Sequence, residues 1–113
     1  MAPRLQLSFF GQFKIELDGK PVCERLARRT YPRRVLQFLA SAPAMVETRS
    51  ALAGALWPGD LTDKLPNRLH QAIHFLRGEL SLIPEPIRPQ VLVDHERVSL
   101  ELPEGVNCDA VEF

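Results

Sequence analysis

The amino-acid sequence predicts a single α+β domain in which short strands lie near both ends of the chain and three helices lie between them. Three observations support this prediction. Apolar and aromatic residues cluster in two short segments within residues 5–17, apolar residues recur at three- and four-residue spacing within residues 30–83, and two short apolar segments flank a polar turn within residues 91–102. Short apolar and aromatic segments bounded by turn residues favour strands, whereas a period of 3.6 favours helices. With 113 residues, the chain is long enough for one modest core.

The N-terminal residues predict an antiparallel β-meander. Segments 5–10 and 13–17 are rich in apolar and aromatic residues and are separated by a glycine, and the second segment ends at the turn dipeptide Asp18-Gly19. A third short strand is expected at residues 22–24.

The middle of the chain predicts three helices. Helical spacing of apolar residues covers about 30–42, and Met45–Glu47 reads as an extended link to the next helix. Thr48 is a good N-cap for that second helix, which ends at Trp57-Pro58 because the residue before a proline is pushed out of the α region. The third and longest helix is expected over about residues 62–83, with its start between residues 62 and 66.

The third helix is amphipathic. One stripe is apolar and must be buried, and it holds Leu69, Ala72, Ile73, Leu76 and Leu80. The opposite face carries hydrogen-bond donors in place of the usual Glu/Lys mixture, namely Asn67, Gln71 and His74, flanked by Arg68, His70, Phe75 and Arg77. For Phe75 we expect partial burial, and for Trp57 a place in the core at the end of the second helix. A plain solvent-exposed face is the simpler alternative for these polar residues.

The C-terminal third predicts a β-hairpin. Three prolines within residues 84–89 cannot continue a helix, and segments 91–93 and 98–102 flank the polar tip 94–97. The predicted order is two helices, a turn, a longer third helix and a hairpin, which is the order of elements in a winged helix-turn-helix. This order predicts that the third helix enters the major groove of DNA and that hairpin 91–102 lies beside it as the wing.

The formal net charge is zero, but the charges are unevenly distributed. Residues 1–83 hold 12 Lys/Arg against 7 Asp/Glu, a balance of +5, and residues 84–113 hold 2 against 7, a balance of −5. Five arginines fall within residues 25–34, which is either a solvated helix start or a phosphate-contacting cluster. The possible phosphate contacts are Arg28, Arg29, Arg33, Arg34, Arg49 and Lys64.

Several classes of function have no support in the sequence. No apolar segment approaches the length of a membrane span, and the N-terminus lacks the apolar core of a signal peptide, so we expect a cytoplasmic protein without membrane contact and two reduced cysteines. His70 and His74 are four residues apart, but no third ligand accompanies them, so we expect no metal. No nucleotide-binding loop or catalytic motif occurs, so we expect neither a cofactor nor an enzyme.

The residues also resemble a known family, the OmpR/PhoB-type winged-helix effector domain. In particular, they resemble the form of this domain found at the N-terminus of transcriptional regulators of the Streptomyces antibiotic regulatory protein (SARP) class. Related bacterial regulators that carry a transcriptional activation domain contain the same form. The resemblance rests on residues 7–13, the turn at 18–22, Arg28-Arg29, Leu56-Trp57-Pro58, the third-helix pattern Asn67, Leu69, Ala72, Ile73, Leu76, Arg77 and Leu80, and residues 108–113.

The resemblance implies a division of the chain and a set of partners. Residues 1–107 would form the DNA-binding domain of a bacterial transcription regulator, and residues 108–113 would begin the linker to a helical activation domain. The same resemblance implies that the protein binds direct-repeat promoter sites as a dimer and contacts RNA polymerase through loop 58–65.

We therefore expect sequence-specific binding of double-stranded DNA. Amide and guanidinium groups form bidentate pairs with purine edges, and arginine also neutralises phosphates. The expected DNA contacts are Asn67, Arg68, His70, Gln71, His74, Arg77 and Arg97. The alternative is a winged helix that binds protein or dimerises, because Phe75, Gly78 and an acidic hairpin stand where the resembled family carries basic residues, or glycines with an aromatic.

Overall fold

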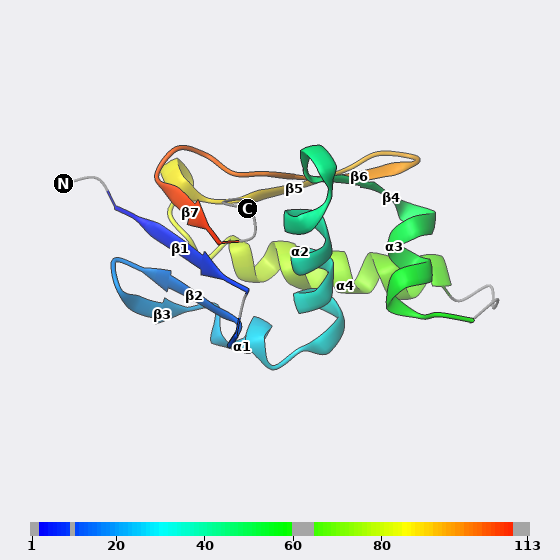
Figure 1. Ribbon diagram of the computed structural model, residues 1–113, viewed down its shortest axis with the longest axis horizontal. Coiled ribbons are helices and arrows are strands. Elements are labelled where there is room, and N and C mark those ends of the chain that lie inside the picture. Colours follow the sequence, from blue (N-terminus) through cyan, green and yellow to red (C-terminus); the bar gives the residue numbers. More distant parts are fainter. Residues whose placement is uncertain (1–2, 10, 60–64, 110–113) are drawn as a thin grey trace.

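The computed structural model describes residues 3–9, 11–59 and 65–109. Over these residues the chain has an α+β fold with four α-helices and two β-sheets (Figure 1). The strands are β1 (Leu5–Ser8), β2 (Lys14–Leu17), β3 (Lys20–Val22), β4 (Val46–Thr48), β5 (Gln90–Val93), β6 (Arg97–Glu101) and β7 (Val106–Cys108). The helices are α1 (Glu24–Ala27), α2 (Thr30–Ser41), α3 (Arg49–Leu56) and α4 (Leu65–Leu80), with 3₁₀ turns at Pro43–Met45 and Glu85–Ile87.

The N-terminal sheet has the strand order β3-β2-β1-β7. The antiparallel meander β1-β2-β3 is confirmed, with Leu5 opposite Leu17 and Ile15 opposite Val22. The third strand was expected at residues 22–24 and lies at Lys20–Val22 instead. Cys23 adopts a left-handed conformation with φ of 53°, which ends the extended backbone and starts α1.

Strand β7 completes this sheet and was not expected from the sequence. It pairs parallel to β1, with Leu7 opposite Cys108. Beyond it, the backbone N–H of Phe9 donates to both carboxylate oxygens of Asp109 at 2.9 and 3.0 Å. The packed body therefore extends through Asp109, two residues beyond the boundary at residue 107 and into the segment assigned to a linker.

The second sheet has the order β4-β6-β5. The hairpin β5-β6 is confirmed, with Val91 opposite Leu100. Met45–Glu47 was expected to be a short extended link, but Met45 ends the 3₁₀ turn with a φ of 55°. Residues 46–48 form strand β4, which pairs with β6 and places Glu47 opposite Val98.

The three expected helices are present, and α1 is an additional helix of four residues. Thr48 caps α3 as expected, because its hydroxyl accepts a 3.0 Å hydrogen bond from the N–H of Ala51. Helix α4 is described from Leu65 and ends at Leu80, three residues before the expected end. Ser81–Ile83 form a turn in which the N–H of Ile83 donates to the carbonyl of Leu80.

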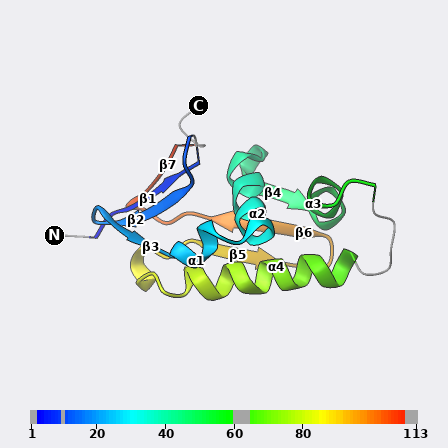
Figure 2. The same ribbon diagram turned by 90° about the horizontal axis from the view of Figure 1, so that it is seen from below.

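The core lies where α4 meets helices α1, α2 and α3 and strand β5, all of which lie on the same side of α4 in Figure 2. The expected apolar stripe of α4 is confirmed, since each of its five residues is 5% exposed or less. It packs with Val35, Leu36 and Leu39 of α2 and with residues of both sheets. None of the helices that the structure describes combines the length and the apolar content needed to cross a bilayer.

Candidate nucleic-acid interface

The outward face of α4 is polar and free of exposed carboxylates. Helix α4 lies along one side of the molecule, with its outer face uncovered by other described elements (Figure 2). All six of its expected contact residues are exposed, namely Asn67, Arg68, His70, Gln71, His74 and Arg77. The one acidic residue within 65–80 is Glu79, which is only 6% exposed. A surface that presents donors without exposed carboxylates does not repel an anionic partner.

A small hollow of about 90 Å³ lies at the junction of α3, α4 and strand β5. We call it the histidine hollow, and it is lined by Arg49, His70, Ile73, His74, Arg77 and Val93. The rings of His70 and His74 are nearly parallel, with centroids 6.5 Å apart and an interplanar angle of 17°. Four basic side chains from α3 and α4 therefore meet beside strand β5, although Arg49 is sixteen residues away from α4 in the chain.

A larger hollow of about 580 Å³ lies on the other flank of α4. We call it the aromatic hollow, and it is lined by Arg29, Thr30, Tyr31, Pro32, Trp57, Arg68, Gln71, Ala72 and Phe75. The rings of Tyr31 and Trp57 lie 4.8 Å apart. Trp57 is half-buried, so it packs against the core as expected and also forms a wall of this hollow.

Phe75 is half-buried, as expected, and two arginines cover it. The guanidinium carbons of Arg25 and Arg29 lie 5.6 and 5.0 Å from the centroid of its ring. Arg25 belongs to the arginine cluster within residues 25–34 but was not among the named phosphate contacts, because nothing local in the sequence places it beside Phe75.

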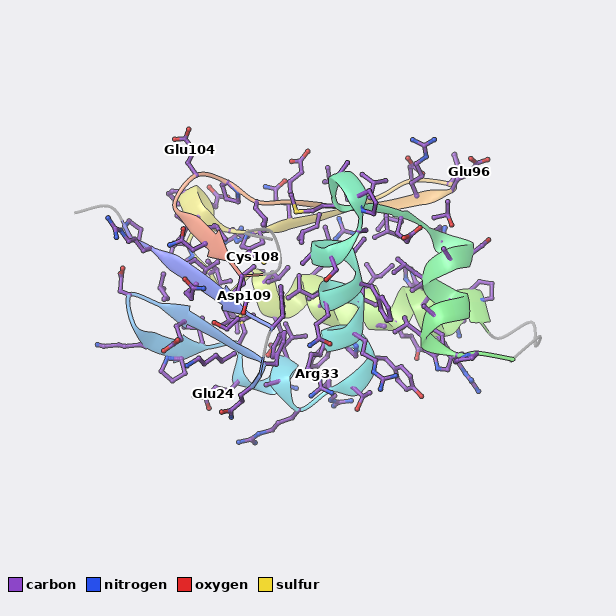
Figure 3. All side chains as sticks on the ribbon, viewed as in Figure 1. Glu24, Arg33, Glu96, Glu104, Cys108 and Asp109 are labelled. Atoms are coloured by element: carbon purple, nitrogen blue, oxygen red, sulfur yellow. The ribbon has the colours of Figure 1, made fainter. Side chains whose placement is uncertain are left out.

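The hairpin tip carries a carboxylate that stabilises the turn. The Asp94 side chain accepts hydrogen bonds from the N–H groups of Glu96 at 2.9 Å and Arg97 at 2.7 Å. These two hydrogen bonds hold the pKa of Asp94 below its usual value. Arg97, an expected DNA contact, is exposed at the start of β6, and Glu96 projects from the same end of the hairpin (Figure 3).

The expected phosphate contacts do not form one surface. Arg29 and Arg49 line the two hollows beside α4, whereas Arg28 lines a separate hollow against the N-terminal sheet. Arg33 is half-buried, and its guanidinium donates to the carbonyl oxygen of Ala27 at 2.9 Å, which stabilises the end of α1 (Figure 3). Arg34 is exposed on α2. Lys64 and most of loop 58–65 lie outside the described residues.

A buried polar pair lies beneath the outward face of α4. The Cys23 thiol donates to the backbone carbonyl of Glu79 at 3.1 Å, and burial, with a further contribution from the Glu79 charge, raises the pKa of Cys23 to about 11. Oxygen Oε1 of Glu79 has no hydrogen-bond partner among the described residues. The sequence alone offered no signal for this pair, because 56 residues separate its members.

Within residues 3–9, 11–59 and 65–109, no three His, Cys, Asp or Glu side chains are grouped so that they could hold a metal ion. Both cysteines are buried free thiols.

Comparison with known proteins identifies no relative of this chain. No protein-family model, curated protein or solved structure matches the chain.

Proposed function

We propose that this chain is the sequence-specific, double-stranded-DNA-binding domain of a bacterial transcription regulator and has a winged helix-turn-helix fold. In this proposal α3 and α4 form the helix-turn-helix, α4 enters the major groove, and the β5-β6 hairpin is the wing. The order of these elements and the packing of α4 against α2 and α3 support the assignment.

One observation carries the proposal. The outward face of α4 presents amide, imidazole and guanidinium groups and no exposed carboxylate, and arginines of other elements lie on both of its flanks. A major-groove helix needs both features, because side-chain amides and guanidinium groups read base edges while flanking cations bind phosphates. The face is therefore suited to reading DNA in a way that an ordinary Glu/Lys surface is not.

The affinity of one domain is expected to be modest. The formal net charge is zero, and few phosphate contacts give weak binding. We propose paired direct-repeat sites occupied by two copies, as the family resemblance implies, because a second domain bound nearby adds avidity. Contact with RNA polymerase through loop 58–65 and activation of transcription are parts of the same proposal.

The test begins by selecting bound duplexes from a randomised DNA library and titrating the selected site at about 50 and 200 mM salt. We expect binding that weakens with salt. Replacing a residue that reads a base costs about 1–3 kcal/mol and relaxes specificity at one position, so Gln71→Ala should do this, and Arg68→Ala should also weaken binding. Gln12→Ala is the matched control, because Gln12 is exposed in the turn between β1 and β2.

A folded domain that binds no duplex even at the lower salt concentration would refute the proposal. The second candidate function is then a winged helix that binds protein. The exposed Leu92 and Val93 on β5, an edge strand of its sheet, favour this candidate, together with the acidic hairpin tip. Self-association or partner binding that is lost in Leu92→Lys would support it.

A further inference from the structure

The packing around Phe75 brings positive charge to a position of α4 that has none of its own. Arg25 belongs to α1, and Arg29 is the residue immediately before α2. Both side chains are exposed, and both guanidinium groups lie over the ring of Phe75, at 5.6 and 5.0 Å from its centroid. Three separate elements therefore meet at one aromatic side chain.

This arrangement holds the arginines while leaving their donors available. A guanidinium group near an aromatic ring is attracted by the negative charge of the ring face. The N–H groups remain available for a second partner, and a planar guanidinium group matches a phosphate in bidentate geometry. Among the described residues neither Arg25 nor Arg29 forms an ion pair, so no carboxylate neutralises them.

The aromatic hollow gives the donors of Arg29 a place to bind an anion. Arg29 and Phe75 form part of its lining, and Arg68 lies on the α4 side. The first turn of α2 also lines the hollow, contains no acidic residue, and begins at an N-cap that makes no side-chain hydrogen bond. The positive end of a twelve-residue helix therefore adds to the charge of the arginines.

We propose that Arg25 and Arg29, held in place by Phe75, bind the sugar-phosphate backbone of DNA along the flank of α4. The proposal rests on the DNA-binding function proposed above. It adds Arg25 to that interface and assigns Phe75 the role of holding both arginines. Phe75 is a positioning residue, since its ring orients two guanidinium groups and carries no charge itself. The positive charge that α4 lacks at residue 75 is supplied by α1 and by the residue before α2.

The salt dependence of DNA binding tests the arginines. Each phosphate that a cation neutralises contributes about 0.9 to the slope of log K against log salt concentration. Arg25→Ala and Arg29→Ala are therefore each expected to lower the magnitude of the slope by about 0.9 and to weaken binding to selected and random duplexes alike. Arg4→Ala is the matched control, because Arg4 is exposed just before β1 and should leave the slope unchanged.

The role of Phe75 needs a readout that a purely structural residue would not change. Phe75→Leu keeps apolar bulk and removes the ring face, so it should lower the salt slope, while Phe75→Tyr should retain the wild-type slope. Arg25→Ala should also have less effect in the Phe75→Leu background than in the wild type, which a double-mutant cycle measures. A Phe75→Leu variant that lowers only the melting temperature would contradict the positioning role.

The outcomes separate this proposal from the function on which it rests. Wild-type protein that binds duplex DNA, together with arginine variants that keep its salt slope, would overturn the phosphate contact and leave DNA binding in place. Wild-type protein that binds no duplex at low salt would overturn both.

Discussion

The backbone N–H of Arg49 donates a 2.8 Å hydrogen bond to the carbonyl oxygen of Glu96, which joins the first residue of α3 to the tip of the β5-β6 hairpin. The adjacent pairing of Thr48 with Arg97 extends this connection into a ladder between β4 and β6. Because α3 also packs against α4, the hairpin tip is held at a set position relative to the outward face of α4. In the proposed complex, the charged side chains of the hairpin tip would therefore lie at a defined position next to the DNA.

Reversing the charge of Glu96 should strengthen DNA binding. The Glu96 side chain is exposed at the hairpin tip, so Glu96→Lys replaces a repulsive charge with an attractive one and should steepen the salt slope by up to about 0.9. Glu104→Lys makes the same change in net charge at the opposite end of the molecule (Figure 3). If the two variants raise affinity equally, net charge and not the hairpin position is responsible.

Removing the α3 cap should destabilise the fold. The Thr48 hydroxyl accepts from the N–H of Ala51 at 3.0 Å, and loss of such a cap costs about 1 kcal/mol. Thr48→Ala should therefore lower the free energy of unfolding by this amount in a urea titration. Thr48→Ser retains the acceptor and should recover most of the loss, whereas an equal loss in both variants would point to the lost methyl group.

The Cys23 thiol should make stability fall at alkaline pH. Burial, together with the Glu79 charge, raises the pKa of Cys23 to about 11 from an ordinary 9.0. Below pH 9 the thiol is protonated in both states, and above it the unfolded chain releases a proton that the native state keeps. The free energy of unfolding should thus decrease by roughly 2–3 kcal/mol as the pH rises to about 11.

Cys23→Ser provides the comparison for this loss. Serine does not ionise in this range and keeps a donor for the Glu79 carbonyl, so between pH 8 and about 10.5 it should lose roughly 2 kcal/mol less than the wild type. Equal losses in the two proteins would show that other groups cause the alkaline decrease.

DNA binding should tighten at mildly acidic pH. His70 and His74 line the histidine hollow with Arg49 and Arg77. A DNA phosphate bound nearby would favour protonated imidazoles, so binding should take up protons and strengthen as the pH falls.

A His70→Gln, His74→Gln double variant should lose most of this pH dependence, and His95→Gln tests the hairpin tip separately. Binding constants measured between roughly pH 5.5 and 8 decide the question. A wild-type constant that does not change over that range would rule the effect out.

The parts of the fold that the sequence predicted are those with a local signal. Helices α2 and α4 show a period of 3.6 over twelve and sixteen residues, and α3 has a cap and a terminating proline. Elements α1, β4 and β7 have three or four residues each, and unlike the equally short β1 and β2 they are not marked by an aromatic-rich segment that ends at a turn. Their stability comes from partners far along the chain, such as β1 for β7.

The sequence by itself determined the amphipathic pattern of α4 and the chemistry of its outward face, because side-chain direction in a helix follows from spacing alone. Only the tertiary structure decided which charges lie beside that face. It brought Arg49 to the histidine hollow, directed Arg33 to the carbonyl of Ala27, and placed Arg25 and Arg29 over Phe75. The physical reason is that these contacts join separate elements, so they depend on how helices pack and strands pair and not on any local pattern of residues.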